Sequence, residues 1–210
     1  LGEGQSPSFM MIACADSRAD PSDIFNAAPG QLFVVRNVAN LVPPYQPDGG
    51  LHGVSAALEY AVNVLKVEHV VVMGHGGCGG VAASLAGEGT PEIGEFVTPW
   101  VRLLKDARDR VVDSGSVNPQ FALELEGIET SLKNLLSFPF VQKAVSAGEL
   151  DGLPASLKAK RTHDVAVDHD AVSWSLDPTE AQLRRLRAHY DGNVTLIDEQ
   201  IGRLLETLDE

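Results

Sequence analysis

The residues best suited to chemistry are the two cysteines of the chain and the polar side chains near them. Cys14 is followed by Asp16 and Arg18 at spacings of two, and two residues separate His75 from Cys78 in a glycine-rich stretch. Thiolate sulfur and imidazole nitrogen are preferred zinc ligands, and a carboxylate oxygen is a further possible donor. Two thiolates, one imidazole and one oxygen position therefore indicate a tetrahedral zinc site.

Two other kinds of site use similar residues. The cysteines could form a redox disulfide, but that interpretation leaves His75, Asp16 and Arg18 without a role. The stretch Gly74–Gly80 could bind phosphate, yet it lacks both the Lys-Ser/Thr ending of a P-loop and the G-x-G-x-x-G spacing. A single Cys is commonly just a small buried hydrophobic residue. The combination of both cysteines with a histidine and a carboxylate favours the metal site.

Short apolar runs place these residues at the ends of strands. The runs 9–15, 32–35 and 70–73 are continuous and apolar, which is typical of central strands in a parallel sheet. Over 53–66 apolar residues recur at helical spacing, which predicts a strand–helix–strand unit. Because the carboxyl ends of parallel strands form the ligand crevice of an open sheet, the two groups of polar residues are expected to meet there.

The rest of the chain is predicted to be mainly helical. Thr90-Pro91 and Asn118-Pro119 are typical of an N-cap followed by proline at the first helical position. We predict helices from about Val81 and over 92–112, 119–147, 179–189 and 196–208, and a hairpin over 163–176. The fold class is therefore α/β, with a central, mostly parallel sheet flanked by helices.

Composition limits the classes of function. The 210 residues suffice for one domain spanning 1–210. A formal net charge of −13 disfavours nucleic acid and anionic membranes as main partners. No apolar run approaches the roughly 20 residues of a membrane helix. We expect a cytoplasmic protein, although the start at Leu1 rather than Met leaves room for an upstream targeting segment.

In its motifs the sequence resembles the β-class carbonic anhydrases of the plant-like branch. The resemblance covers residues 4 to 150 or so, and the pair C-x-D-x-R and H-x-x-C is its most specific part. After Leu150 the resemblance degrades, and the helical C-terminal extension 179–210 has no counterpart in the family. The matching segments include Gly4-Gln5-Ser6-Pro7, Cys14-Ala15-Asp16-Ser17-Arg18, Phe33-Val34-Val35-Arg36-Asn37-Val38-Ala39-Asn40, Ala57-Leu58-Glu59-Tyr60-Ala61-Val62 and Gly74-His75-Gly76-Gly77-Cys78-Gly79-Gly80.

The resemblance implies a zinc lyase, carbonate dehydratase, which converts carbon dioxide reversibly to bicarbonate and a proton via zinc-bound hydroxide. Cys14, His75 and Cys78 would hold one Zn²⁺ per chain. Asp16 would either fill the fourth metal position or turn onto Arg18 and leave room for water. Asp16 and Arg18 are thus the expected catalytic pair.

The resemblance also implies a substrate pocket and an oligomer. Gln5, Phe33, Val38 and Tyr60 match the substrate pocket of the plant-like branch, with Phe33 and Tyr60 contributed by a neighbouring subunit. Gln5 would donate its amide N–H to a substrate oxygen. We therefore expect a homodimer or homotetramer.

Two alternatives stay open. The same site could hydrolyse carbonyl sulfide or carbon disulfide, because only the dimensions of the pocket would differ. The protein could instead be a non-catalytic zinc-binding scaffold. The presence of Gln5, Asp16 and Arg18 argues against the scaffold, since a structural zinc needs none of them.

Overall fold

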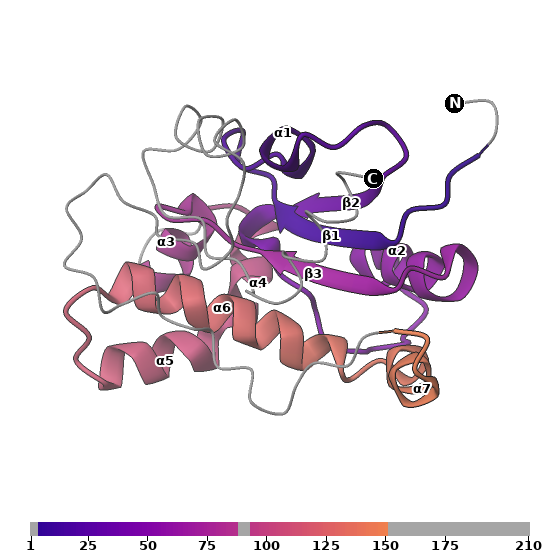
Figure 1. Ribbon diagram of the computed structural model, residues 1–210. Helices are drawn as coiled ribbons and strands as arrows, with labels where there is room; N and C mark the ends of the chain where they lie inside the picture. Colours follow the sequence, from indigo (N-terminus) through magenta and orange to yellow (C-terminus); the bar gives the residue numbers. More distant parts are fainter. Residues whose placement is uncertain (1–3, 88–92, 151–210) are drawn as a thin grey trace.

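A parallel sheet lies at the centre of the protein, whose structure is a computed structural model that describes residues 4–87 and 93–150 (Figure 1). Its strands are β1 (Phe9–Cys14), β2 (Leu32–Asn37) and β3 (His69–Met73), in the order β2-β1-β3. β1 pairs in parallel with both neighbours, so that the carboxyl ends of all three strands lie at the same edge. The predicted strands and their parallel arrangement are confirmed.

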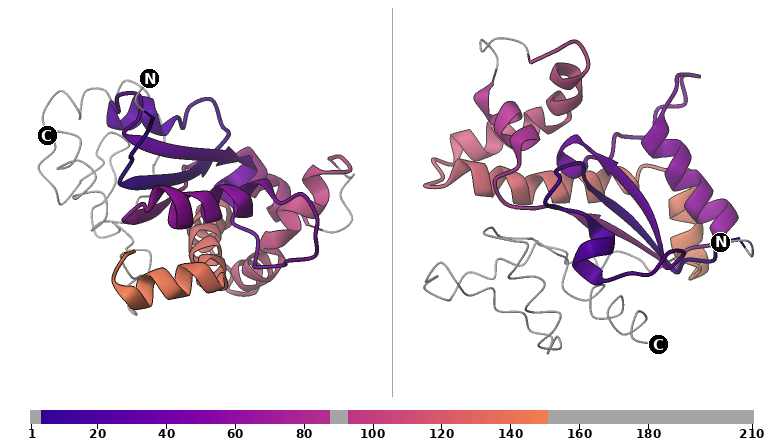
Figure 2. Two further views of the ribbon diagram at one scale, coloured as in Figure 1. Left: turned by 90° about the vertical axis from the view of Figure 1, so that its right-hand side faces the viewer. Right: turned by 90° about the horizontal axis from the view of Figure 1, so that it is seen from above.

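One face of the sheet packs against helices from three parts of the chain. They are α2 (Gly53–Glu59), α6 (Pro119–Leu135) and α7 (Pro139–Ala147), and Figure 2 shows them on one side of the strands. Met10 and Ile12 point toward these helices and are completely buried. The helices on this face confirm the predicted α/β architecture.

The opposite face of the sheet contacts a short helix that was not predicted. This helix, α1, spans Pro21–Phe25 and packs Ile24 and Phe25 against the strands. Its N-cap is Asp20, whose Oδ1 accepts the N–H of Ser22 at 2.9 Å. An N-cap followed by proline is the same signature that predicted a later helix, so α1 could have been found from the sequence.

Two helices replace the single helix predicted over 119–147. α6 ends at Leu135, and α7 begins only at Pro139. Phe138 between them has an extended backbone, with φ −81° and ψ 120°. The prediction was wrong here because the residue before a proline is disfavoured in helical conformation. The predicted start at Asn118 is confirmed, since its side chain caps the helix by accepting the N–H of Phe121 at 3.2 Å.

The crossover helix predicted over 53–66 changes its geometry along its length. After α2 the chain continues as a π-helical segment, η2 (Tyr60–Leu65), and ends where Lys66 adopts a left-handed conformation with φ 59°. π-Helical segments interrupt the regular i→i+4 pattern and are often found near functional residues.

After β2 a short 3₁₀ turn, η1 (Val38–Asn40), leads the chain away from the sheet.

The region after β3 is also more segmented than predicted. α3 (Gly79–Ala86) begins two residues before the predicted Val81. The helix predicted over 92–112 is divided into α4 (Val97–Val101), the 3₁₀ turn η3 (Arg102–Leu104) and α5 (Lys105–Asp113).

Several predicted elements fall outside the described ranges. These are the Thr90-Pro91 start, the hairpin over 163–176 and the helices within 179–210. In the ranges 4–87 and 93–150, no helix has both the length and the apolar composition to cross a membrane.

Candidate metal centre

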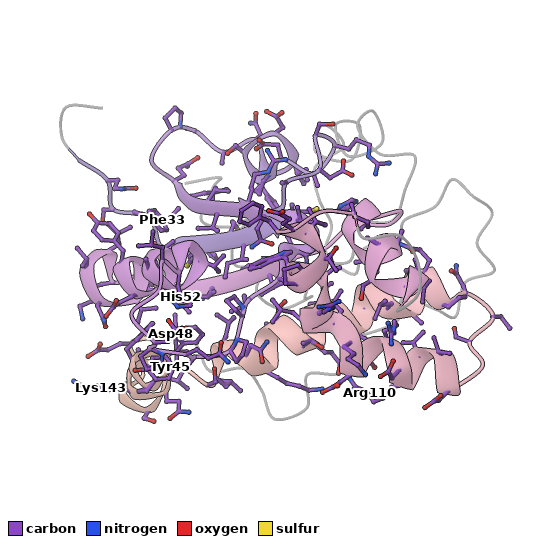
Figure 3. The ribbon with its side chains drawn as sticks, turned by 180° about the vertical axis from the view of Figure 1, so that it is seen from behind. Phe33, Tyr45, Asp48, His52, Arg110 and Lys143 are labelled. Carbon is purple, nitrogen blue, oxygen red and sulfur yellow. The ribbon has the colours of Figure 1, made fainter. Side chains whose placement is uncertain are left out.

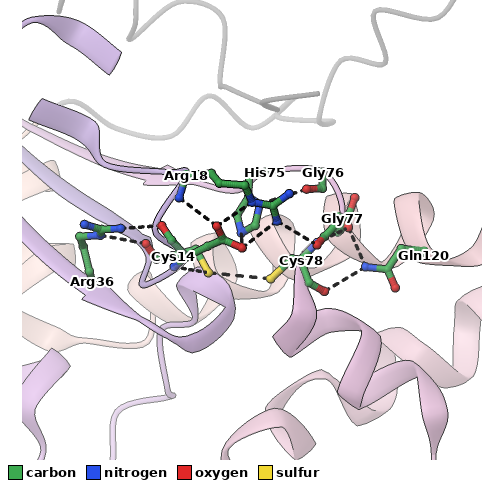
Figure 4. Close-up of polar contacts among 10 residues, drawn as sticks. Cys14, Arg18, Arg36, His75, Gly76, Gly77, Cys78 and Gln120 are labelled. Carbon is green, nitrogen blue, oxygen red and sulfur yellow. Dashed lines mark hydrogen bonds and ion pairs between the residues drawn. The ribbon is translucent and has the colours of Figure 1, made fainter. Parts of the chain in front are cut away.

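The three expected metal ligands meet at the carboxyl edge of the sheet (Figure 4). Cys14 ends β1, whereas His75 and Cys78 lie in the loop between β3 and α3. The two Sγ atoms are 3.8 Å apart. One ligand atom from each of the three residues lies within 4.8 Å of the others, and all three side chains are buried. The parallel topology thus joins two cysteines that are 64 positions apart in the sequence.

Backbone amides surround the two sulfur atoms. The N–H of Asp16 lies 3.5 Å from Sγ of Cys14. The amides of Val81 and Gly80, in the first turn of α3, favour the thiolate form of Cys78. N–H groups at the start of a helix carry partial positive charge and stabilise a nearby thiolate. The backbone therefore supports negative charge on both sulfurs.

In the absence of a cation, the two sulfurs share one proton. The hydrogen bond from the Cys78 thiol lowers the pKa of Cys14 to about 4, against the opposing effect of burial. The same hydrogen bond, together with burial, raises the pKa of Cys78 far above the usual range. The pair consequently favours a single proton held between its two sulfurs.

His75 presents its Nε2 to the sulfurs. Its Nδ1 donates to the carbonyl oxygen of Gly76 at 3.0 Å, which leaves the lone pair on Nε2. Nε2 is buried and has no hydrogen-bond partner among the residues that the structure describes. Burial acts to lower the pKa of His75, but the negative charges of Cys14 and Asp16 outweigh it and raise the pKa overall. An orphaned imidazole nitrogen beside two sulfurs is the arrangement of a metal ligand.

The geometry of this donor set fits Zn²⁺. Two thiolates bound at about 2.3 Å with a tetrahedral angle between them lie about 3.8 Å apart. The observed distance between the Sγ atoms of Cys14 and Cys78 is 3.8 Å. Two sulfurs and one imidazole nitrogen leave one position of a tetrahedron for another oxygen or nitrogen donor.

Asp16 lies beside the three ligands, and its carboxylate is turned onto Arg18. Nε and Nη2 of Arg18 donate to the two carboxylate oxygens at 2.9 and 2.8 Å. The side-chain and backbone hydrogen bonds from Arg18 hold the pKa of Asp16 well below its usual range. Oδ2 of Asp16 is nevertheless only 3.8 Å from Nε2 of His75. Of the two arrangements left open by the sequence, the structure shows the one with Asp16 on Arg18.

Two charged residues that the sequence analysis missed contact the metal-site loops. Oε1 of Glu124 accepts the N–H of Cys78 at 3.0 Å, and Gln120 donates to the same oxygen at 2.7 Å. Arg36 donates to two backbone carbonyls in the loop that begins at Cys14. Each tethers a segment that carries a metal ligand.

The sequence contains a signal for both residues. Glu124 lies on the buried stripe of α6, three and four positions from apolar or small residues such as Ile128 and Gly127. Arg36 follows the apolar run 32–35 directly. A charge in an otherwise apolar pattern needs a specific polar partner once it is buried, and it therefore marks a candidate site.

Among the four expected pocket residues, Val38 lies next to the metal-site loops. It belongs to the turn after β2, and its carbonyl accepts Nε1–H of Trp100 at 2.7 Å. A Cβ placed on Gly80 would be 2.5 Å from Cγ1 of Val38 and 3.0 Å from Cβ of Ala39. The absence of a side chain at Gly80 thus permits the close approach of α3 to this turn.

The other three expected pocket residues lie away from the sulfurs within this chain. Gln5 precedes β1 at the amino end of the sheet and is exposed. Phe33 is four positions before the end of β2, a distance of about 13 Å along a strand. Its ring is 5.9 Å from that of Tyr60, and Figure 3 shows Phe33 toward the end of the sheet where the strands begin. The structure of one chain therefore brings Phe33 and Tyr60 together but does not bring them to the metal site.

A comparison with protein families matches most of the described chain. The family described as carbonic anhydrase matches residues 9–159. The β carbonic anhydrase 3 of Arabidopsis thaliana is 41% identical over 157 residues, which are 71% of this chain. The match spans 60% of the length of that relative.

Solved structures of similar proteins share the fold. The β-carbonic anhydrase CcaA is 33% identical with a TM-score of 0.66, and the match covers 71% of this chain and 68% of CcaA. A β-carbonic anhydrase from the filamentous ascomycete Sordaria macrospora is 31% identical with a TM-score of 0.60, and the match covers 69% of this chain and 72% of the fungal one. The fungal enzyme is described as tetrameric.

Proposed function

This chain belongs to the β class of the carbonic anhydrases, and on that premise we propose that it catalyses the reversible hydration of carbon dioxide to bicarbonate and a proton. One Zn²⁺ per chain would be held by Cys14, His75 and Cys78, whose donor atoms lie within 4.8 Å of one another. The observation that carries the proposal is the joining of these three buried donors at one sheet edge, with Asp16 held beside them by Arg18.

The chain's own residues prepare the reaction around the metal. Bound Zn²⁺ supplies a Lewis acid that lowers the pKa of a water molecule. Asp16, whose pKa is held low by Arg18, is an ionised hydrogen-bond acceptor at neutral pH. Its Oδ2 lies 3.8 Å from Nε2 of His75, beside the residues that would hold the metal. Asp16 would accept a hydrogen bond from that water and so orient its lone pair toward carbon dioxide.

Arg18 keeps Asp16 available for that task. Its guanidinium contacts both carboxylate oxygens, and its Nη2 also donates to the carbonyl of Gly77 at 3.3 Å. This last contact ties the pair to the loop that carries His75 and Cys78. A planar guanidinium fits a carboxylate in this two-pronged way, whereas an ammonium group cannot.

The substrate pocket is completed across a subunit interface. Val38 supplies an apolar wall from the same chain, while Phe33 and Tyr60 come from the partner. Gln5 is the amide donor for a substrate oxygen. The position of Phe33 about 13 Å from the end of its strand supports this division, because within one chain it lies far from the metal ligands. The assembly is accordingly a homodimer or a homotetramer of single-domain chains.

The two thiols suit a reducing compartment, and we place the protein in the cytoplasm. Cys14 and Cys78 are free and buried, with their sulfurs 3.8 Å apart. An oxidising compartment would favour a disulfide between sulfurs this close, which would remove both ligands.

Metal analysis combined with a carbon dioxide hydration assay tests the proposal. We expect one zinc per chain in the wild type and in Asp16→Asn, and a loss of hydration rate of about a hundredfold in Asp16→Asn, since a positioned proton acceptor contributes that much or more. Asp109→Asn, which removes an exposed charge on α5, is the matched control and should change neither quantity.

Two results would contradict the proposal. Zinc binding without hydration at alkaline pH would favour the non-catalytic scaffold. Hydrolysis of carbonyl sulfide or carbon disulfide without hydration of carbon dioxide would reassign the same site to sulfur analogues.

A further inference from the structure

Arg36 holds the backbone of the loop that carries Asp16. It is the second-last residue of β2 and lies opposite Ala13 of β1. Its Nε donates to the carbonyl of Cys14 at 3.0 Å, and its Nη2 donates to the carbonyl of Asp16 at 2.6 Å. The third nitrogen, Nη1, contacts Oδ2 of Asp20 at 2.6 Å. All three nitrogens of one rigid planar group are therefore in use, and Figure 4 shows the two contacts of Arg36 with the loop carbonyls.

These contacts determine the orientation of two peptide groups around the metal site. β1 ends at Cys14, and the N–H of Ala15 still donates to the carbonyl of Asn37 in β2 at 2.8 Å before the chain turns away from the sheet. The carbonyl of Asp16 also accepts the N–H of Ala19 at 2.9 Å, so Arg36 reinforces a tight turn. A rotation of the peptide at Asp16 would move its carboxylate relative to both Arg18 and the metal ligands.

We propose that Arg36, braced by Asp20, is a positioning residue that keeps the carboxylate of Asp16 on Arg18 and away from the fourth metal position. The inference rests on the proposed function, because it concerns access to that position. Arg18 holds the carboxylate directly, whereas Arg36 acts one step earlier, on the backbone from which the carboxylate projects. Arg18 thus contacts the carboxylate of Asp16, and Arg36 contacts the backbone carbonyl of the same residue.

The chemistry of the three acceptors explains why arginine is required at position 36. Two carbonyl oxygens and one carboxylate oxygen surround the guanidinium and match the fixed directions of its N–H groups. A lysine ammonium is a single point donor on a flexible stem, so it cannot span the carbonyls of Cys14 and Asp16 together with Asp20. The Arg36 side chain is 26% exposed, which leaves its hydrogen bonds partly shielded from water.

Asp20 connects this arrangement to α1. Its Oδ1 caps the helix through the N–H of Ser22, and its Oδ2 receives Arg36. Asparagine is as good an N-cap as aspartate, so Asp20→Asn should preserve α1 while it removes the ion pair with Arg36.

Anion binding to the Co²⁺-loaded full chain tests the proposal. Thiocyanate occupies an open metal position, and its dissociation constant can be measured from the visible spectrum of the cobalt ion. In Arg36→Lys we expect thiocyanate to bind about tenfold more weakly while Co²⁺ is retained, since a tenfold change corresponds to about 1.4 kcal/mol, the size of a hydrogen bond to a charged group. The reason is that the released Asp16 carboxylate competes for the position.

A double-mutant cycle with Asp16→Asn separates positioning from a merely structural role. If Arg36 acts through Asp16, then Arg36→Lys should leave thiocyanate binding unchanged in the Asp16→Asn background. An equal weakening in both backgrounds, or no weakening in the wild-type background, would overturn the proposal. Arg110→Lys, which alters an exposed ion pair with Glu126, is the matched control and should not change thiocyanate binding (Figure 3).

Two further results complete the test. Asp20→Asn should also weaken thiocyanate binding, but by less than Arg36→Lys. If Arg36→Lys does not fold, Asp20→Asn provides the test in its place. Unchanged thiocyanate binding in Asp20→Asn would then overturn the proposal. If the wild type hydrates carbon dioxide and Arg36→Lys binds thiocyanate as tightly as the wild type, the role proposed for Arg36 is refuted but the proposed function stands. A wild-type chain that binds no metal would instead refute the proposed function.

Discussion

At the scale of single residues, Cys14 and Cys78 carry one proton between them, and a metal ion has to displace it. The pKa of Cys14 is lowered to about 4, so this residue is already a thiolate at neutral pH. The pKa of Cys78 is raised, so its thiol stays protonated until the metal binds. Zinc affinity should therefore rise with pH, by about tenfold per pH unit for one released proton.

Calorimetry checks this prediction. Zinc binding at pH 8, measured in two buffers of different ionisation enthalpy, should release about one proton per metal ion. A zinc affinity that does not change between pH 7 and pH 8 would show that the metal-free site holds no such proton.

Arg18→Lys should separate turnover from metal binding. Lysine keeps the positive charge but loses the two-pronged contact with Asp16, whose oxygens now lie 2.9 and 2.8 Å from the guanidinium nitrogens. We expect the hydration rate to fall about ten- to a hundredfold, in line with a lost charged hydrogen bond, while the zinc content per chain is unchanged. If zinc is lost in proportion to activity, Arg18 maintains the structure of the metal site and does not control access to the fourth metal position.

The meeting of Cys14, His75 and Cys78 could be predicted from the sequence because their positions follow from strand ends. Cys14 closes one apolar run, and His75 follows another, so parallel topology alone brings them together. Glu124 and Arg36 escaped prediction because the groups that they hold in the loops of the site are backbone groups, which every residue has. Their own positions in apolar patterns were the available signal.

At the scale of elements, the contact between α3 and the turn after β2 has no room for a side chain. Gly80→Ala would place a Cβ 2.5 Å from Cγ1 of Val38, so either α3 or Val38 must shift. We expect a loss of stability of about 1–3 kcal/mol, as for overpacking in a core. Gly79→Ala is the matched control, because no described atom outside its chain neighbours and the backbone of its own helix lies within 4 Å of the added Cβ.

Thermal unfolding of the two variants decides the point. Gly80→Ala should melt at a lower temperature than the wild type, whereas Gly79→Ala should melt at the same or a slightly higher temperature. Equal melting temperatures for the two variants would mean that the turn at Val38 shifts to accommodate the added Cβ without loss of stability.

The strands were more predictable than the helices, for a physical reason. Strands buried on both faces have continuous apolar runs that depend little on their neighbours. The break at Pro139 was present in the sequence, since a proline restricts the residue before it. The change to π-helical geometry at Tyr60 has no such local mark, because a shift in hydrogen-bond pattern reflects packing of the finished structure.

At the scale of the whole molecule, pocket residues shared between subunits predict complementation. Cys14→Ser should abolish zinc binding, and Tyr60→Ala should impair the pocket; each variant alone should have low activity. Co-expressed chains of the two kinds should regain part of the hydration rate, because the zinc site of one chain would receive the intact Tyr60 of the other. Tyr60 is half exposed in the single chain, which leaves it available to a partner.

The control for this experiment places both substitutions in the same chain. When the Cys14→Ser, Tyr60→Ala double variant is co-expressed with the wild type, mixed oligomers form in which the wild-type zinc site faces a partner that lacks Tyr60. The hydration rate per wild-type chain should therefore fall. Absence of any recovery in the first mixture, despite mixed oligomers, would place Tyr60 in the pocket of its own subunit and contradict the proposed assembly.

The contacts of α6 have a consequence for the order in which the site is completed during synthesis. α6 tethers the Cys78 loop through Glu124, 46 residues later in the chain, and the turn after β2 through Ser131, which is 91 residues beyond Asn40. Both cysteines therefore leave the ribosome well before the helix that braces their loops. A nascent chain that ends before α6 lacks these braces, so metal capture with native geometry is a late event that follows the docking of this helix.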